Sequence, residues 1–227
     1  EGNRPPGIVG PDEDLAERRR AETLEAARIL GAARVEFLGY RDSGMKGSPA
    51  NADPASFLAA DVDQAAGRLA AVVRAEAADF LAIYDETGVT GHPDHVKVHH
   101  VGRRAADLVG DRLRVVEGTL SRTQARRLIG QARQLTGRGG DDAGGGSGPS
   151  MDIDLDRFGT PDEDVTDWVD VRPFLDHKRR AMAAHASQIA ETSFFLDMAP
   201  EVFAAIWGQE CLISRSDPAF RYDDLLA

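Results

Sequence analysis

The spacing of apolar residues predicts two helices in the first third of the chain. Residues 12–30 begin with acidic side chains and end before Gly31, and Leu24, Ala27 and Leu30 fall on one helical face. Residues 61–78 have the clearest helical period, with a stripe formed by Val62, Ala65, Ala66, Leu69, Val72 and Val73. Stripes of this kind pack against a core, so both helices are expected to be amphipathic.

Short apolar runs predict strands between the helices. Residues 34–38 alternate in character and predict a short strand, and residues 80–84 predict a buried strand that is followed by a helix over 93–109. Residues 113–120 predict another strand, and residues 121–135 another helix. Strands that alternate with helices indicate βαβ units, so we expect an α/β fold with a parallel sheet.

The last part of the chain is predicted to be largely helical. Residues 137–149 are rich in glycine and predict a mobile surface loop, with a lid over a functional site as the alternative. Residues 166–171 lead into a long predicted helix over 171–190, which carries His185 and Gln188, and residues 196–207 predict a further helix. A length of 227 residues suits one domain, or at most two small ones.

Charge and composition exclude several classes of protein. The net charge of −11 and the isoelectric point near 5.0 argue against a general nucleic-acid surface, which needs clustered cations. No apolar run approaches the roughly 20 residues of a membrane span, and no signal-peptide pattern opens the chain. Cys211 is the only cysteine, so no internal disulfide can form. We expect a cytoplasmic protein with neither nucleic-acid nor membrane partners; its oligomeric state is left open.

Residues suited to chemistry concentrate directly after the strand expected at 80–84. Residues 91–95 read Gly-His-Pro-Asp-His, so His92, Asp94 and His95 share a short turn at the carboxyl end of that strand. Open α/β sheets bind ligands at this edge. Neutral imidazole is the commonest metal ligand and also transfers protons near pH 7. The pattern therefore indicates a hydrolytic metal site; the alternative is that these histidines are structural or solvated.

A second candidate group follows the strand expected at 34–38. Arg41 and Asp42 stand in a glycine-containing loop at the same predicted edge of the sheet. Asp42 can accept hydrogen bonds from sugar hydroxyls, and Arg41 can donate a planar fork to an oxygen-rich group. We therefore predict that both residues bind substrate. Alternatively, they pair with each other and brace the turn.

Several motifs together resemble the LmbE-like, or PIG-L, family of N-acetylglucosaminyl deacetylases, and most closely its mycothiol S-conjugate amidase-like branch. Besides Gly-His-Pro-Asp-His, the motifs are Arg41-Asp42-Ser43-Gly44-Met45, Tyr84-Asp85-Glu86 and His185-Ala186-Ser187-Gln188. The resemblance covers most of the chain. It implies a Rossmann-like, doubly wound, three-layer fold with a mostly parallel sheet, and one catalytic Zn²⁺ per intact protein.

The resemblance also implies roles for individual residues. His95 would be a metal ligand, and His92 would stabilise the oxyanion or protonate the leaving amine. Asp94 would orient His92 and tune its charge. Such a carboxylate fixes the tautomer of an imidazole and raises its basicity, and three protein ligands with an open fourth position suit a hydrolytic zinc.

Two departures from the family pattern stand out. The sequence contains no AHPDD-type motif, which in the family supplies a His and an Asp to the metal, and Glu1 and Gly2 match residues that follow the second strand of the family's first βαβ unit. We therefore expect a single domain over 1–227 that is N-terminally incomplete, lacks two metal ligands and the general base, and binds zinc weakly or not at all as a fragment. In addition, Thr90 stands where the mycothiol branch often has tyrosine.

The sequence thus predicts a zinc-dependent amidohydrolase. It would remove an N-acetyl, or other N-acyl, group from an amino sugar or sugar conjugate, and its partner would be that small-molecule substrate. The alternative is a non-catalytic α/β sugar-binding domain that retains half of the metal site.

Overall fold

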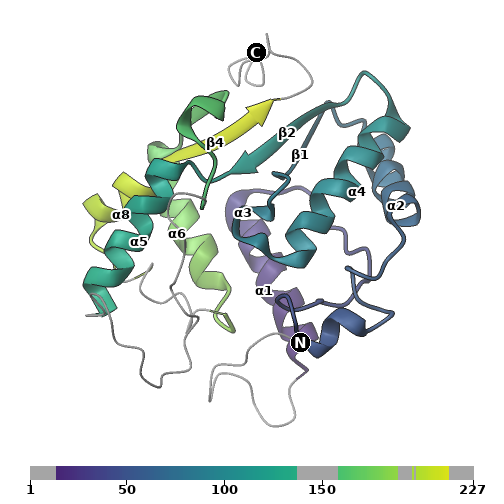
Figure 1. The fold of residues 1–227 in the computed structure, drawn as a ribbon, viewed down its shortest axis with the longest axis horizontal. Helices are drawn as coiled ribbons and strands as arrows, with labels where there is room; N and C mark the ends of the chain where they lie inside the picture. The colour runs from purple at the N-terminus through teal and green to yellow at the C-terminus, as the bar shows by residue number, and fades with distance from the viewer. Residues whose placement is uncertain (1–13, 137–157, 189–195, 197, 215–227) are drawn as a thin grey trace.

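Four strands form one mixed sheet in the computed structural model, which describes residues 14–136, 158–188, 196 and 198–214. The strands are β1 (Phe80–Tyr84), β2 (Arg114–Thr119), β3 (Asp167–Asp170) and β4 (Gln209–Ser214), in the spatial order β1-β2-β4-β3 (Figure 1). β1 and β2 are parallel, whereas β4 is antiparallel to both of its neighbours. The predicted α/β fold is confirmed, but the sheet of the described residues is mixed rather than mostly parallel, with one parallel and two antiparallel pairings.

The elements around the candidate site follow the predicted pattern closely. The helix α2 (Val62–Ala75) begins at Asp61, whose carboxylate accepts from the backbone N–H of Gln64, and it buries Ala65, Ala66 and Val73 of the predicted stripe. β1 and α4 (Pro93–Val109) have the predicted bounds, and α5 (Arg122–Thr136) follows β2 as expected. The predicted alternation of helices and strands is therefore confirmed for residues 61–136.

The helix α1 (Leu15–Leu30) forms where predicted but buries a different face. Asp14 caps its start and Gly31, at φ 76°, ends it in the left-handed conformation that glycine adopts without steric cost. The predicted apolar face was wrong, because Leu24 is 47% exposed and Leu30 is 62% exposed. Leu15, Glu22 and Ala26 are buried instead. Glu22 forms a buried polar contact with Ser187, which follows α6 (Leu175–Ala184). This contact, which hydrophobic spacing does not reveal, orients α1 against α6.

The strand expected at 34–38 is not formed, and this expectation was wrong. A strand requires a neighbouring backbone, and residues 34–38 have no ladder in the described part of the chain. Their side chains have other contacts: Arg34 forms ion pairs with Glu36 and Glu76, and the guanidinium of Arg20 lies 4.2 Å from the centre of the Phe37 ring.

The predicted long helix over 171–190 is shorter in the structure. A 3₁₀ turn (Arg172–Phe174) precedes α6 (Leu175–Ala184), and His185 and Gln188 lie in the turn that follows. The helix ends there because the next backbone N–H groups turn to other acceptors, as when Ser187 donates to the Glu22 carboxylate. The helix expected over 196–207 begins only at proline, as α8 (Pro200–Trp207), and residues 137–149 lie outside the described part.

The strand β4 has no counterpart among the expected elements. Its sequence Gln-Glu-Cys-Leu-Ile-Ser lacks a clear apolar run, although Cys211 and Ile213 are buried in the sheet. An antiparallel strand also needs no crossover helix, so the βαβ pattern could not indicate it.

Two apolar clusters hold the layers together. Ala65, Ala66, Ala70, Val101 and Ala105 pack between α2 and α4, and Met198, Phe203 and Ile206 pack with side chains of α5 and α6. Figure 1 shows α2 and α4 together on one side of the molecule and α5, α6 and α8 on the other. Of the helices that the structure describes, none is both long and apolar enough for a bilayer crossing.

Candidate metal and active site

The amino end of α4 holds the residues singled out in the Gly-His-Pro-Asp-His motif. β1 ends at Tyr84, and the chain returns through a tight loop and the one-turn helix α3 (Gly88–Gly91) to His92. His92 is the N-cap of α4: its backbone is extended, and its ring Nδ1 accepts from the backbone N–H of Asp94 at 3.1 Å. Pro93 occupies the first helical position, where its missing N–H costs nothing.

Ser43 brings the Arg-Asp-Ser-Gly-Met loop against this helix end. Its backbone N–H donates to one Asp94 carboxylate oxygen at 3.0 Å, and its hydroxyl donates to the other. The same hydroxyl accepts from the backbone N–H of Leu58, and Ser43 is fully buried. These contacts fix Asp42, the preceding residue, beside α4.

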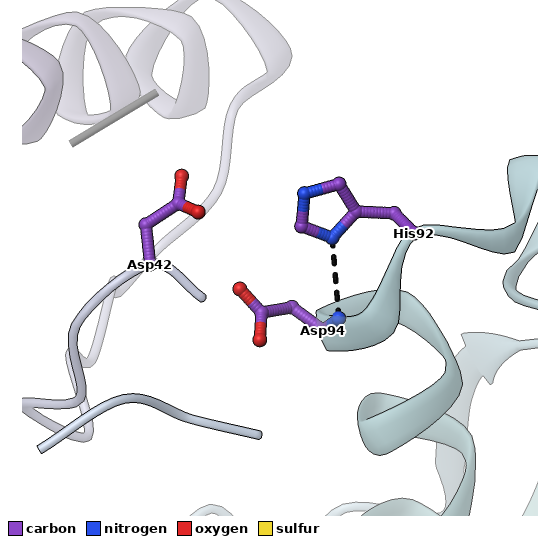
Figure 2. Close-up of side chains that lie close together, drawn as sticks. All are labelled: Asp42, His92 and Asp94. Carbon is purple, nitrogen blue, oxygen red and sulfur yellow. Dashed lines mark hydrogen bonds between the residues drawn. The ribbon is translucent and has the colours of Figure 1, made fainter. Parts of the chain in front are cut away.

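The result is a cluster of three potential metal ligands. One donor atom each from Asp42, His92 and Asp94 lies within 4.8 Å of the other two. Figure 2 shows the Asp42 carboxylate facing the His92 ring across a gap, with Asp94 below them on α4. The Asp42 carboxylate also accepts from the backbone N–H of Gly44.

The two histidines have opposite hydrogen-bonding patterns. His92 Nδ1 accepts from a backbone N–H, so the proton of the neutral ring is on Nε2. His95 Nδ1 lies 3.2 Å from the carbonyl oxygen of Gly88, which can only accept, so His95 carries its proton on Nδ1 and has a lone pair on Nε2. The ring centres are 5.0 Å apart.

The surroundings of His95 favour the neutral ring. It stacks on Tyr84 with 4.2 Å between ring centres. Burial lowers the pKa of His95, and this effect outweighs the opposing hydrogen bond to Gly88. A neutral imidazole with Nδ1 held by a carbonyl and Nε2 available is the arrangement that metal-binding histidines adopt.

The contacts of two further candidate residues differ from those expected. Asp94 orients His92 through its backbone N–H, because its carboxylate is bonded to Ser43. Arg41 is 62% exposed at its side chain and pairs with Asp53 at 3.2 Å. The alternative that Arg41 and Asp42 pair with each other is not realised, since each has another partner.

Sequence reasoning missed Arg19 and Ser43. Arg19 Nη1 lies 3.6 Å from the Asp42 carboxylate, and its Nε is buried with no hydrogen-bond partner among the described residues. It stands in a run of three arginines that resembles an ordinary solvated helix face. Ser43 was part of a recognised motif, but no spacing rule indicates that it bonds to a residue 51 positions away.

A cavity of about 680 Å³ lies beside the loop that leads to His92. Its wall includes Thr90 and Gly91 of that loop, and Arg122, Phe158 and Asp164 on the other side. The Nε of Arg122 is buried and, within the described ranges, has no hydrogen-bond partner. A volume of this size accommodates a small organic ligand.

Comparisons with known proteins identify relatives of this chain. The sequence profile of the PIG-L family, described as GlcNAc-PI de-N-acetylase, matches residues 1–106. A 1D-myo-inositol 2-acetamido-2-deoxy-alpha-D-glucopyranoside deacetylase from Acidothermus cellulolyticus is 34% identical over 231 aligned positions, which cover 97% of this chain and 77% of the relative. A deacetylase of the same name from Thermobifida fusca is 40% identical, over 78% of this chain and 63% of the relative. The chain therefore spans less than two thirds of the second protein.

The fold has a counterpart among solved structures. The crystal structure of the conserved protein TT1542 from Thermus thermophilus superposes with a TM-score of 0.52 over 95% of this chain and 78% of that chain, at 18% sequence identity. This likeness supports the fold, and the sequence relatives identify the family. The resemblance drawn from the motifs is confirmed: the chain belongs to the PIG-L family of de-N-acetylases.

Proposed function

We propose that the protein is a zinc-dependent hydrolase that removes the N-acetyl group from an N-acetylglucosaminyl conjugate, with N-acetylglucosaminyl inositol as the first candidate. The names of the relatives support the substrate class. The observation that carries the reaction is the pair of imidazoles at the start of α4, one with a free lone pair on Nε2 and the other with a proton there. A metal ligand needs the free lone pair on Nε2, and an oxyanion donor needs the proton there.

Of the residues present, His95 would supply one ligand to a zinc ion through Nε2. It lies outside the cluster of Asp42, His92 and Asp94 but beside His92, with 5.0 Å between the ring centres. When bound, zinc polarises an amide carbonyl and lowers the pKa of a bound water. The neutral state of His95, favoured by burial, leaves its lone pair available without the loss of a proton.

His92 would act on the carbonyl oxygen of the substrate. Its Nε2–H can donate to that oxygen as negative charge develops, and the bond from the Asp94 backbone to Nδ1 holds the ring in place. To protonate the leaving amine, His92 would need a proton on each ring nitrogen, because a neutral ring that loses its Nε2 proton becomes an imidazolate. The backbone N–H of Asp94 already occupies the Nδ1 lone pair, where the second proton would have to bind. The geometry therefore favours oxyanion stabilisation by His92 over protonation of the leaving amine.

The remaining polar groups suit a sugar. Asp42 would accept hydrogen bonds from ring hydroxyls, and Arg19 beside it would donate to a substrate oxygen. The cavity next to Thr90 would provide room for the rest of the conjugate, with Arg122 as a donor. Substrate binding by Arg41 stays a prediction, because its guanidinium pairs with Asp53.

An amine-release assay tests the function. The protein, expressed from its complete gene, is incubated with N-acetylglucosaminyl inositol and with N-acetylglucosamine, and free amine is quantified. We expect release from the conjugate that stops with a chelator and returns with zinc. Binding of both sugars without amine release by the zinc-treated protein would instead support the non-catalytic sugar-binding alternative.

A further inference from the structure

The loop between β1 and α4 is held by one buried carboxylate. Asp85, only 3% exposed, accepts on Oδ1 from the Thr87 backbone at 2.9 Å, the Thr87 hydroxyl at 2.7 Å and the Val89 backbone at 3.0 Å. Its other oxygen accepts from the hydroxyl of Thr119 on β2. Burial alone would raise the pKa of Asp85, but these hydrogen bonds outweigh it and hold the pKa below its ordinary value. The carboxylate is therefore ionised and fully engaged at neutral pH.

This carboxylate stabilises a strained backbone. Val89 has φ 61° and ψ −54°, a conformation near that of the rare γ-turn with positive φ. Such a conformation is unfavourable for any residue with a Cβ and more so for a β-branched one. The Val89 N–H is one of the groups that Asp85 binds, so this bond helps to keep Val89 in its unfavourable conformation.

The strained turn presses the backbone of Gly88 against α4. A Cβ on Gly88 would lie 2.7 Å from the backbone nitrogen of Val96 and 2.8 Å from the Cβ of His95, so only glycine fits. The carbonyl oxygen of this same residue is the acceptor for His95 Nδ1. The position of that acceptor thus depends on the turn that Asp85 holds.

We propose that Asp85 is a positioning residue: by holding the turn through Val89, it aims the Gly88 carbonyl at His95 and keeps the His95 proton on Nδ1. The consequence for catalysis rests on the proposed function. A proton on Nδ1 leaves the lone pair of His95 on Nε2, which is the atom that would bind the metal. Asp85 itself touches neither His95 nor the substrate in this scheme. Its effect reaches His95 through two intervening residues.

The tautomers of the ring nitrogens provide a direct test. ¹⁵N-resolved NMR spectra of the imidazoles are recorded on the chelator-treated protein at a pH where both rings are neutral. We expect His95 with its proton on Nδ1 and His92 with its proton on Nε2. In Asp85→Asn, whose amide cannot accept all four hydrogen bonds, His95 should become a mixture of tautomers while His92 stays unchanged as an internal control.

A second substitution separates positioning from general stabilisation. Glycine adopts the Val89 conformation without a Cβ clash, so Asp85→Asn/Val89→Gly should restore much of the Nδ1–H population of His95. Zinc affinity should follow the tautomer, with a loss on the order of 10- to 100-fold in Asp85→Asn and partial recovery in the double variant. A merely destabilised protein would not regain the tautomer when an additional glycine is introduced.

A milder variant keeps the proposal testable if Asp85→Asn does not fold. Thr87→Val removes one exposed donor to Asp85 and should shift the His95 tautomer in the same direction by a smaller amount. An unchanged Nδ1–H tautomer in every folded variant would overturn the role of Asp85. Since the spectra need neither metal nor substrate, this result is independent of the amine-release assay, and an inactive protein would still test it.

Discussion

At the scale of single residues, His92 combines two tasks that a substitution can separate. Its ring Nδ1 caps α4, and its Nε2–H is the proposed donor to the substrate oxygen. Asparagine is among the best N-cap residues, so it can cap α4 in place of His92. Its side chain is too short to reach the substrate oxygen, so it cannot act as the donor. The pair His92→Asn and His92→Ala therefore distinguishes capping from catalysis.

We expect His92→Asn to lower kcat by roughly 10²–10³ with an unchanged thermal midpoint, because one oxyanion donor is lost and the cap is kept. His92→Ala should show a similar kcat and an additional destabilisation of about 1 kcal/mol. Steady-state kinetics, calorimetry and zinc analysis measure the three properties. Loss of zinc from His92→Asn would show that His92 is a ligand and would reverse the roles proposed for His92 and His95.

The sequence was sufficient to single out the residues of this candidate site, but not to predict which residues they contact. His92, Asp94 and Asp42 were all selected from local motifs, and the structure brings them together. The hydrogen bond from Ser43 to Asp94 and the approach of Arg19 to Asp42 join distant segments. No periodicity encodes such contacts, since they depend on how the elements pack.

At the scale of elements, the packing of α4 on β1 positions the site on the sheet. Gly102 lies in the middle of α4, and a Cβ there would be 2.4 Å from Ile83 Cγ2. Ile83 is only 7% exposed and is held in the sheet, so its side chain has little room to move. Gly67 in α2 provides the contrast, because a Cβ there would meet nothing within 4 Å.

Alanine at these two positions should therefore act in opposite directions. Gly102→Ala should destabilise the protein by about 1–3 kcal/mol through overpacking. Gly67→Ala should stabilise it by roughly 0.5–1 kcal/mol, because alanine is the better helix former. Urea unfolding measures both. Stabilisation by Gly102→Ala would contradict the close approach of α4 to β1.

Element prediction succeeded where the hydrophobic signal was strong. The segments β1, α2 and α4 have clear periods and turn residues at their ends, and their bounds were predicted within a few residues. It failed at 34–38, where the alternating pattern has no neighbouring strand in the described structure. It also failed at β4, a central strand whose apolar run, Cys211 to Ile213, is too short to predict a strand. A strand is defined by its partner, which local sequence does not specify.

At the scale of the whole molecule, one buried carboxylate joins segments from opposite ends of the described chain. Glu22 on α1 accepts from both the backbone N–H and the hydroxyl of Ser187, at 2.8 and 2.7 Å, and from Arg18 at 3.0 Å. Its side chain is 5% exposed. The late His-Ala-Ser-Gln motif, whose function the sequence left open, therefore contributes the contact that attaches α1 to the end of α6.

This contact predicts a specific pH dependence of stability. Burial alone would raise the pKa of Glu22, but the hydrogen bonds from Ser187 and Arg18 outweigh it, so the folded-state pKa lies below the ordinary value of 4.5. The ionised carboxylate therefore stabilises the folded state. This stabilisation is complete at pH values above the ordinary pKa and is lost progressively as the pH falls through the lowered pKa of the folded state.

At pH 7, Glu22→Gln should destabilise the protein by about 1–3 kcal/mol, since it leaves buried donors poorly satisfied. Urea unfolding at pH 7 and in the acid range should show the difference from wild type shrinking as pH falls. Glu25→Gln, an exposed change on the same helix, should have little effect at any pH. A constant difference between wild type and Glu22→Gln across this range would mean that the carboxylate charge does not hold α1 in place.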